Sequence, residues 1–180
     1  MRNRATAPAP LTEEELAGWF AGRLPEGLYK GAPTISTDRD EILVVGDIDE
    51  PEVPADASEG TRAAARSARI ARFRGETRDA RIRVAHDAER LFGRKVSWGA
   101  RCGGTEELFT TLGVPVMTRL GLEDRRVLDT LIDATVARSR SEALAWCVRL
   151  VAQHQSDWID SLRTALTSVE KVRAEGPDVA

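Results

Sequence analysis

The side chains with the clearest chemical potential in this sequence are arginines, and most of them gather in one segment. Between Thr61 and Arg101 there are twelve basic residues and four acidic ones, although the 180-residue chain carries a formal net charge of −3. A guanidinium group offers several donors in one plane, a geometry that suits phosphate. The segment therefore favours a polyanionic partner. We expect a basic surface made of Arg66, Arg69, Arg72, Arg78, Arg94 and Lys95.

The segment just before these arginines has the opposite charge. From Asp38 to Glu59 there are nine acidic residues against one basic residue, Arg39. Residues 47–60 include Pro51 and Pro54 and predict an exposed loop. Acidic loop and basic helix could pair with each other inside the chain, which would leave fewer cations for a partner. Arginine could also serve here as the ordinary solubilising cation, so the alternatives stay open.

Nucleophiles and metal ligands are sparse. His86 and His154 are isolated, with no carboxylate or thiol at metal-ligand spacing. Cys102 is expected as an unreactive thiol in a loop at 99–104, and Cys147 falls on an apolar helix face. The glycines at 99–104 lack the Gly-Lys-Ser/Thr of a phosphate loop. We therefore expect no catalytic residues, metal or cofactor, and a protein that is not an enzyme.

The N-terminal half predicts a helix, a hairpin, a long helix and a strand. Residues 11–24 form an amphipathic helix capped by Thr12, with an apolar face. Residues 34–37 and 41–48 predict a hairpin, and residues 95–98 a third strand. One long basic helix is expected over 62–92, bent near Gly75 and stopped by Gly93. Trp98 is expected in the core or an interface, the alternative being a base-stacking role beside the cations.

The C-terminal part predicts mainly helix. Residues 105–111 suggest a short helix, 114–120 an extended segment, and 122–135 and 140–154 two further helices. The spacing of Ser139 and Glu142 is typical of a capping box. Apolar positions continue from Trp158 to Val169, so a last helix runs on or restarts at Ser156.

A known family shares part of this pattern. Thr118-Arg119-Leu120 is followed by Leu128, Leu131 and Ile132, and then by residues 136–144, which read VARSRSEAL. Over residues 115–155 this order resembles the ribbon-helix-helix DNA-binding proteins of the MetJ, Arc and CopG type. The chain departs from them at Asp124 and Arg125, where that family usually has apolar residues.

The resemblance implies a homodimer whose paired strands enter the major groove of DNA. It implies base contacts by Arg119, which can bond guanine in a bidentate way, and apolar contacts by Met117. It further implies phosphate contacts at the start of the second helix. These would come from Arg138, Ser139, Arg140 and Ser141.

These observations predict an α+β, mostly helical chain. A tail at 1–10, without the apolar stretch of a secretion signal, precedes an α+β module at 11–104. A ribbon-helix-helix-like module at 105–174 and a tail at 175–180 follow. The expected function is double-stranded DNA binding by a cytoplasmic homodimer, as a transcriptional regulator or chromosome-associated factor, with no membrane partner. A protein partner or small effector at the N-terminal module stays open. The alternatives are a scaffold protein that uses the fold only to dimerise, and an RNA- or ribosome-associated factor that uses the basic helix.

Overall fold

The computed structural model of the protein describes residues 12–175, without the side chains of residues 170, 171 and 173–175. The predicted tail at 1–10 and most of that at 175–180 lie outside this range. The chain divides into two compact units, one ending at Pro115 and the other starting at Val116. We refer to them as the N-terminal and C-terminal units. No described helix combines the length and apolar character that a membrane crossing needs.

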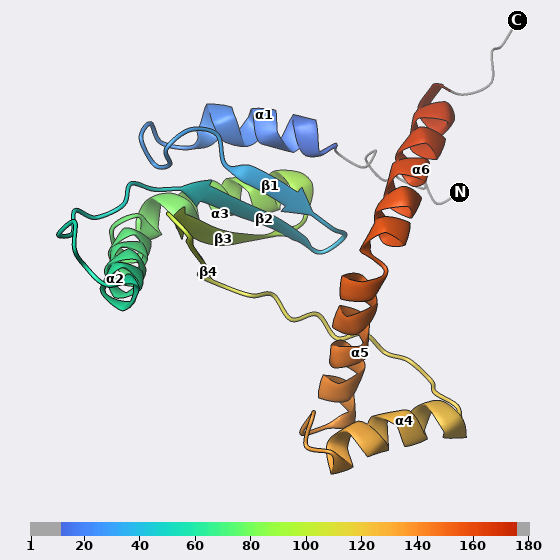
Figure 1. The fold of residues 1–180 in the computed structure, drawn as a ribbon. Coiled ribbons are helices and arrows are strands. Elements are labelled where there is room, and N and C mark those ends of the chain that lie inside the picture. The colour runs from blue at the N-terminus through green and yellow to red at the C-terminus, as the bar shows by residue number, and fades with distance from the viewer. Residues whose placement is uncertain (1–11, 176–180) are drawn as a thin grey trace, which may run out of the picture. The chain divides into compact units, whose positions relative to one another are not determined.

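A four-stranded mixed sheet forms the centre of the N-terminal unit (Figure 1). Strands β1 (Thr34–Thr37) and β2 (Glu41–Asp47) make the predicted hairpin. Strand β3 (Lys95–Cys102) lies parallel to β2, and β4 (Thr105–Leu108) pairs antiparallel with β3. The sheet order is β1-β2-β3-β4. A parallel β2–β3 pair requires a crossover, which the two arginine-rich helices supply.

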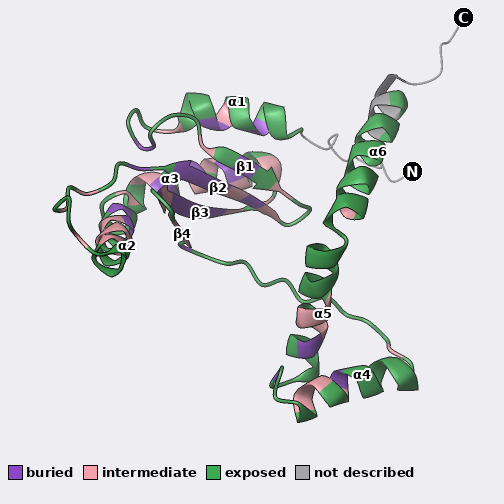
Figure 2. Ribbon diagram, viewed as in Figure 1, coloured by how far each residue is buried: buried purple, intermediate pink, exposed green. Residues whose placement is uncertain are grey.

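Three helices cover this sheet: α1 (Glu13–Arg23), α2 (Glu59–Glu76) and α3 (Arg78–Phe92). On the sheet, Val44 is in register with Trp98 and both are buried. Phe20 of α1 meets the Trp98 ring edge to face at 6.1 Å. One hydrophobic core results, which Figure 2 shows as buried segments along the strands and the inner faces of the helices. Trp98 is therefore a core residue, as predicted, and base stacking by it is excluded.

The expected single helix over 62–92 is wrong, because the helical segment breaks at Thr77. Helix α2 starts earlier, after the N-cap Ser58, and α3 ends at Gly93 in the left-handed conformation, as predicted. The Thr77 hydroxyl donates to the carbonyl of Phe73 at 2.7 Å, an interaction that competes with the regular helical ladder. The break thus lies two residues after Gly75, where the sequence suggested a bend.

The expectations for residues 99–111 are also wrong. Strand β3 continues through the expected glycine loop to Cys102, and the expected helix at 105–111 begins as β4. Gly103, with a φ of +56°, makes the turn between them. Cross-strand pairing overrides the weak local helix signal, since Gly99 pairs with Leu108 and Cys102 with Thr105.

The C-terminal unit is all helical, with α4 (Leu122–Asp133), α5 (Arg140–His154) and α6 (Ser156–Glu175). Of the two outcomes that the sequence left open for the last helix, the structure has the restart at Ser156. Residues 110–121 contain no helix or strand, so the extended segment expected at 114–120 is not a β-strand of the described chain. Pro115 has no N–H to offer a ladder, and no described strand lies opposite.

Candidate nucleic-acid interface

The residues predicted to contact bases lie on the connection between the two units. Met117 is 99% exposed, and Arg119 is exposed beside it. Neither is part of a paired strand. Their base-contact role stays a prediction, but the described chain contains no ribbon that would carry them into a groove.

The four predicted phosphate-binding residues lie at the start of α5, where three of them already make local contacts. The Ser139 hydroxyl accepts from the Glu142 N–H at 3.2 Å, which confirms half of the capping box. The Glu142 carboxylate accepts from the N–H of Arg138, one residue earlier than a capping box requires. Arg140 donates twice to Asp129 of α4, both at 2.7 Å. Ser141 is exposed.

The Arg140–Asp129 pair shifts both ionisable groups. The hydrogen bond from Arg140 lowers the pKa of the Asp129 carboxyl, and the pKa of Arg140 is raised in turn. Both groups are surface groups, with about half of each side chain exposed. Arg140 therefore links α4 to α5, and a DNA phosphate would have to compete with Asp129 for it.

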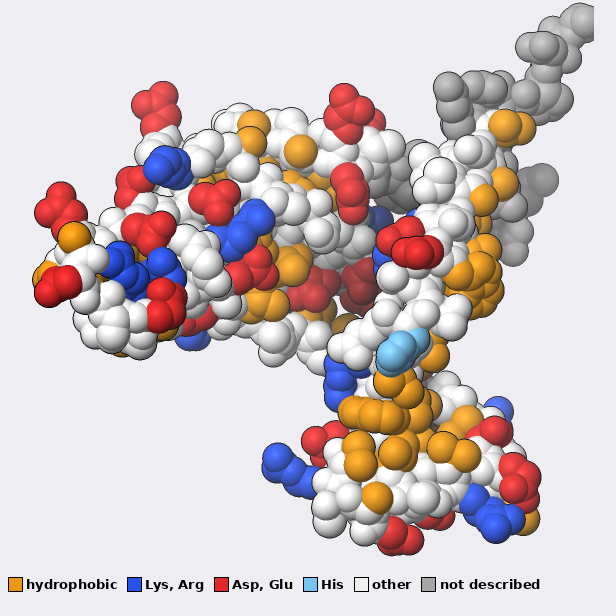
Figure 3. Space-filling view, in the orientation of Figure 1, with side chains coloured by type: hydrophobic (Ala, Val, Ile, Leu, Met, Phe, Trp, Pro, Cys, Tyr) orange, Lys and Arg blue, Asp and Glu red, His pale blue; other side chains and the backbone are white. Residues whose placement is uncertain are grey.

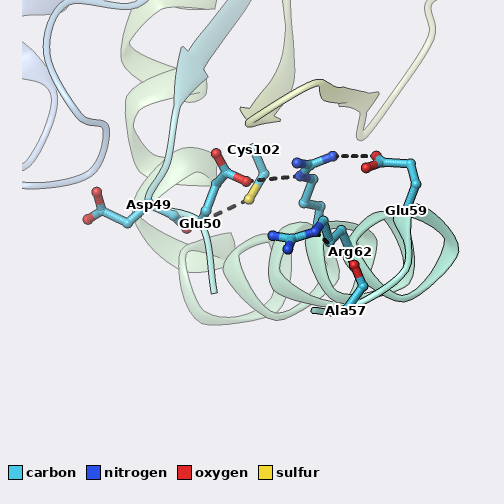
Figure 4. A network of polar contacts seen from close by, with 7 residues as sticks. Asp49, Glu50, Ala57, Glu59, Arg62 and Cys102 are labelled. Atoms are coloured by element: carbon cyan, nitrogen blue, oxygen red, sulfur yellow. Dashed lines mark hydrogen bonds and ion pairs between the residues drawn. The ribbon is translucent and has the colours of Figure 1, made fainter. Parts of the chain in front are cut away.

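Part of the basic surface pairs with the acidic loop, as one of the two alternatives anticipated. Arg66 donates to Glu50 and to Glu59, each at 2.9 Å, and hydrogen bonding to Glu50 raises its pKa. Figure 4 shows Glu50 and Glu59 turned toward this network, with Arg62 beside them. Arg62 donates to the loop carbonyls of Ala57 and Ala55. Through Glu50, Ala55 and Ala57, the two arginines thus fasten the loop before α2 to that helix.

The other predicted members of the basic surface differ in how strongly they are held. Lys95 pairs with Glu89 at 2.7 Å, and Arg94 donates to the Thr37 hydroxyl. The pairs made by Arg72 and Arg78 are longer, at 3.7 and 3.8 Å. Arg69 makes no ion pair among the described residues, and its Nη1 atom is buried without a hydrogen-bond partner there. The six residues do not form one free cationic surface.

The structure instead brings three arginines together around a pocket at the α2–α3 break. Arg74, Arg78 and Arg81 line this arginine pocket, which has a volume of about 470 Å³ and apolar walls that include Trp98 and Phe109. The sequence placed all three on the basic helix. It gave no sign that Phe109, the residue after β4, would meet them.

Arg81 has an unusual environment for a buried cation. It is 7% exposed, and its guanidinium lies 4.7 Å from the centre of the Phe109 ring. It donates to the Arg74 carbonyl at 2.6 Å and to the Thr77 hydroxyl, so α2's C-terminal end partly balances its charge. Burial lowers its pKa. No carboxylate pairs with Arg81 within the described range, so the pocket keeps a net positive charge.

The two cysteine thiols and the potential metal ligands do not form a reactive site among the described residues. Cys102 is fully buried at the end of β3, which corrects the expected loop thiol, and burial raises its pKa away from the reactive thiolate. Cys147 is only partly buried against the small C-terminal core. Between residues 12 and 175, no three potential metal ligands gather at one point.

Comparison with known proteins covers both units. A family model described as the Rv1265-like protein, N-terminal domain, matches residues 14–108, and the Mb1296 C-terminal domain matches residues 121–173. Three mycobacterial proteins are 53% identical over 163 residues, which is 91% of this chain and 70% of each relative. They are named as uncharacterized proteins: Mb1296 of Mycobacterium bovis, and MT1303 and Rv1265 of Mycobacterium tuberculosis.

The chain belongs to the Rv1265-like family. No solved structure matches it. The resemblance to ribbon-helix-helix proteins is therefore wrong, because residues 121–173 belong to the Mb1296 C-terminal domain. The shared pattern consists of a capped helix start and an apolar helix face, which unrelated helical hairpins also need. The family match leaves out residues 109–120, where the expected strand would have been.

Proposed function

We propose that this Rv1265-like chain binds double-stranded DNA as a homodimer, as a transcriptional regulator or chromosome-associated protein in the cytoplasm, and is not an enzyme. The observation that carries the proposal is the charge of the α2–α3 crossover. These two helices contain nine arginines and five acidic residues. Duplex DNA carries one negative charge per ~1.7 Å of helix axis, so it suits such a surface.

The surface that best supports this function surrounds the arginine pocket. Arg74 and Arg78 lie on either side of the α2–α3 break, both are exposed, and both line the pocket with the buried Arg81. Arg74 makes no carboxylate pair among the described residues, and Arg78 only a long one to its neighbour Asp79. Planar guanidinium groups can bind phosphate oxygens in pairs. This contact positions the protein on the backbone and reads no sequence.

The arginine pocket also suits a small effector, a possibility that the sequence left open for the N-terminal unit. Its positive charge favours an anionic group, and its apolar walls favour a ligand with some apolar surface. A second pocket of about 420 Å³ near Arg94 also contains Asp40 and Glu89, so its charges largely cancel. An anionic effector in the arginine pocket would compete with a DNA phosphate for Arg74 and Arg78.

The RNA-associated alternative loses its main support. It relied on the basic helix together with Trp98 as a stacking platform, and Trp98 is only 4% exposed, in the core. The scaffold alternative keeps one supporting observation, the exposed apolar side chains of the C-terminal unit. Duplex binding that depends on the pocket arginines would distinguish DNA binding from a scaffold role.

A salt titration tests the proposal. Fluorescence anisotropy of a labelled duplex should report binding that weakens steeply with salt, with a log–log slope of roughly 0.9 per neutralised phosphate. The double variant Arg74→Gln/Arg78→Gln should lower the affinity and reduce that slope by roughly 1.8, because two phosphate contacts are lost. No binding by the native chain at ~50 mM salt would reject DNA binding.

A matched control removes equal charge from the same helices. Arg72→Gln/Arg90→Gln also loses one arginine from α2 and one from α3, but neither of these residues lines the arginine pocket. We expect this control to keep most of the native slope. Equal losses in both double variants would mean that net charge alone, and not the pocket surface, determines binding.

A further inference from the structure

The C-terminal unit exposes a continuous apolar stripe along α5 and α6. Seven exposed side chains form it, three, four or seven residues apart, so that they share one helix face. Each of the seven residues is between 43% and 67% exposed. Figure 3 shows hydrophobic side chains gathered along both helices. We refer to this set as the α5–α6 stripe. It consists of Val148, Val151, Trp158, Leu162, Leu166, Val169 and Val172.

The unit's own core is too small to account for this surface. Among its described side chains, only Leu128, Ala137 and Ala143 are buried in this core, with four partly buried neighbours. A helical unit of this length normally buries more than half of the surface that its unfolded chain exposes. Isolated apolar residues on a surface are ordinary, but a contiguous row along two helices marks an interaction site.

Between Cys147 and Leu166, most of the described side chains beside the stripe are uncharged. One edge is formed by Cys147, His154 and Ser161, and the other by Ala152 and Ile159. Arg149 and Asp160 lie on the opposite side by helical periodicity, whereas Arg163 borders the edge that contains Ile159. A neighbouring helix can therefore approach this part of the stripe while Arg163 stays at the solvated rim, and an apolar centre with a polar rim is typical of an interface.

We propose that a second copy of this chain covers the stripe, with the paired α5–α6 segments running antiparallel. This inference rests on the homodimer of the proposed function and supplies its interface. The exposed residues run from Val148 to Val172, so a two-fold axis near position 160 covers all of them. That register sets Val148 opposite Val172, Val151 opposite Val169, and Trp158 opposite Leu162.

The available area matches a dimer of this kind. From their exposed fractions, the seven side chains offer on the order of 700 Å² per copy, close to the ~800 Å² that each partner buries in a standard interface. Gln155, at the break between α5 and α6, falls opposite Ala165. A small residue facing the larger polar one leaves room for its side chain.

Sedimentation equilibrium of the full chain tests the proposal. The native chain should be dimeric at micromolar concentration, and Leu162→Glu should weaken dimerisation at least a hundredfold because it buries an unpaired charge. Val127→Asp is the matched control, since Val127 is a 56% exposed residue on α4 outside the stripe. Circular dichroism of both variants establishes that the helices remain folded.

The antiparallel register has its own test. Trp158→Lys alone should also be monomeric, and mixing it with Leu162→Glu should restore a dimer, because the new lysine of one copy faces the new glutamate of the other.

A native chain that stays monomeric would overturn the proposal and leave the stripe to another part of the chain or another protein. Single variants that dissociate but never recombine would overturn the register. DNA binding by monomeric Leu162→Glu would uphold the DNA proposal whatever happens to the dimer.

Discussion

At the scale of single residues, two buried polar groups of the N-terminal unit, on Arg81 and Tyr29, bond to neutral partners and not to opposite charges. Arg81 bonds a backbone carbonyl and a threonine hydroxyl and lies against an aromatic ring. The Tyr29 hydroxyl donates to the Gly99 carbonyl at 3.0 Å, and burial raises the pKa of that phenol. Such contacts fix side chains in place because a buried polar group without a partner costs free energy.

The close approach of the Tyr29 ring to Gly46 leaves no room for a Cβ atom at that position. A Cβ at Gly46 would lie 2.3 Å from the Tyr29 ring, which the hydroxyl contact with Gly99 holds in place. Gly46→Ala should therefore lower the free energy of unfolding by roughly 1–3 kcal/mol, through overpacking. Urea unfolding followed by tryptophan fluorescence measures this change.

Gly18→Ala is the matched control for that substitution. Gly18 is exposed within α1, and a Cβ there meets nothing within 4 Å. Alanine at this helical position should raise the free energy of unfolding by up to about 1 kcal/mol. Equal stability of Gly46→Ala and the native chain would show that the Tyr29 ring can move aside.

At the scale of elements, the helical pair α4–α5 is tied by one ion pair and a very small core. Asp129 and Arg140 join the two helices across the turn that contains Thr135, a residue with a φ of +59°. The pair is solvated, so its contribution to stability is modest. Its effect is nevertheless measurable, because few other contacts hold α4 to α5.

The lowered pKa of Asp129 predicts how stability depends on pH. A carboxyl whose pKa is lower in the folded state stabilises it fully above the unfolded pKa of about 3.9. This contribution is lost as the pH falls through the lower, folded-state pKa. Asp129→Asn should thus lower the melting temperature at pH 7 and match the native chain in strong acid.

Thermal unfolding by circular dichroism across pH checks this expectation. Asp160→Asn removes a carboxylate from an ion pair within α6 and serves as the control. It should have less effect at pH 7, since that pair joins no two elements. A difference between Asp129→Asn and the native chain that persists at low pH would assign the effect to packing and not to charge.

At the scale of the whole molecule, two units are joined by an exposed connection. Residues 110–121 have no helix or strand, and residues 110–119 are all exposed. Such a segment can enter a protease site without unfolding a core. Brief trypsin treatment should therefore cut after Arg119 and give fragments of residues 1–119 and 120–180.

Mass spectrometry of the fragments identifies the cut. Arg119→Gln should delay the separation of the two fragments, whereas Arg163→Gln, within α6, should not. Duplex DNA should slow the cut if Arg119 contacts it, and leave the rate unchanged if the arginine pocket binds DNA alone. An early cut within α2 or α3 would contradict the exposed-connection interpretation.

The sequence alone determined the features that depend on neighbours in the chain. The cap at Thr12, the hairpin at residues 34–47, the stop at Gly93 and the helix restart at Ser156 follow from local hydrogen bonding and apolar spacing. These signals act over a few residues, so they can be recognised without a fold. The resemblance to ribbon-helix-helix proteins failed for the same reason, since it rested on a local pattern that many helical hairpins share.

Only the tertiary structure decided which arginines are available and which are occupied. Arg66 binds Glu50, sixteen residues away, and Arg81 meets Phe109 only because β4 pairs with β3. The strand at residues 105–108 likewise exists through pairing that its own composition does not favour. Ion pairs, strand registers and pockets join residues that are distant in sequence, so no local pattern encodes them. The arginine segment visible in the sequence therefore became a pocket only when the strands placed an aromatic ring against it.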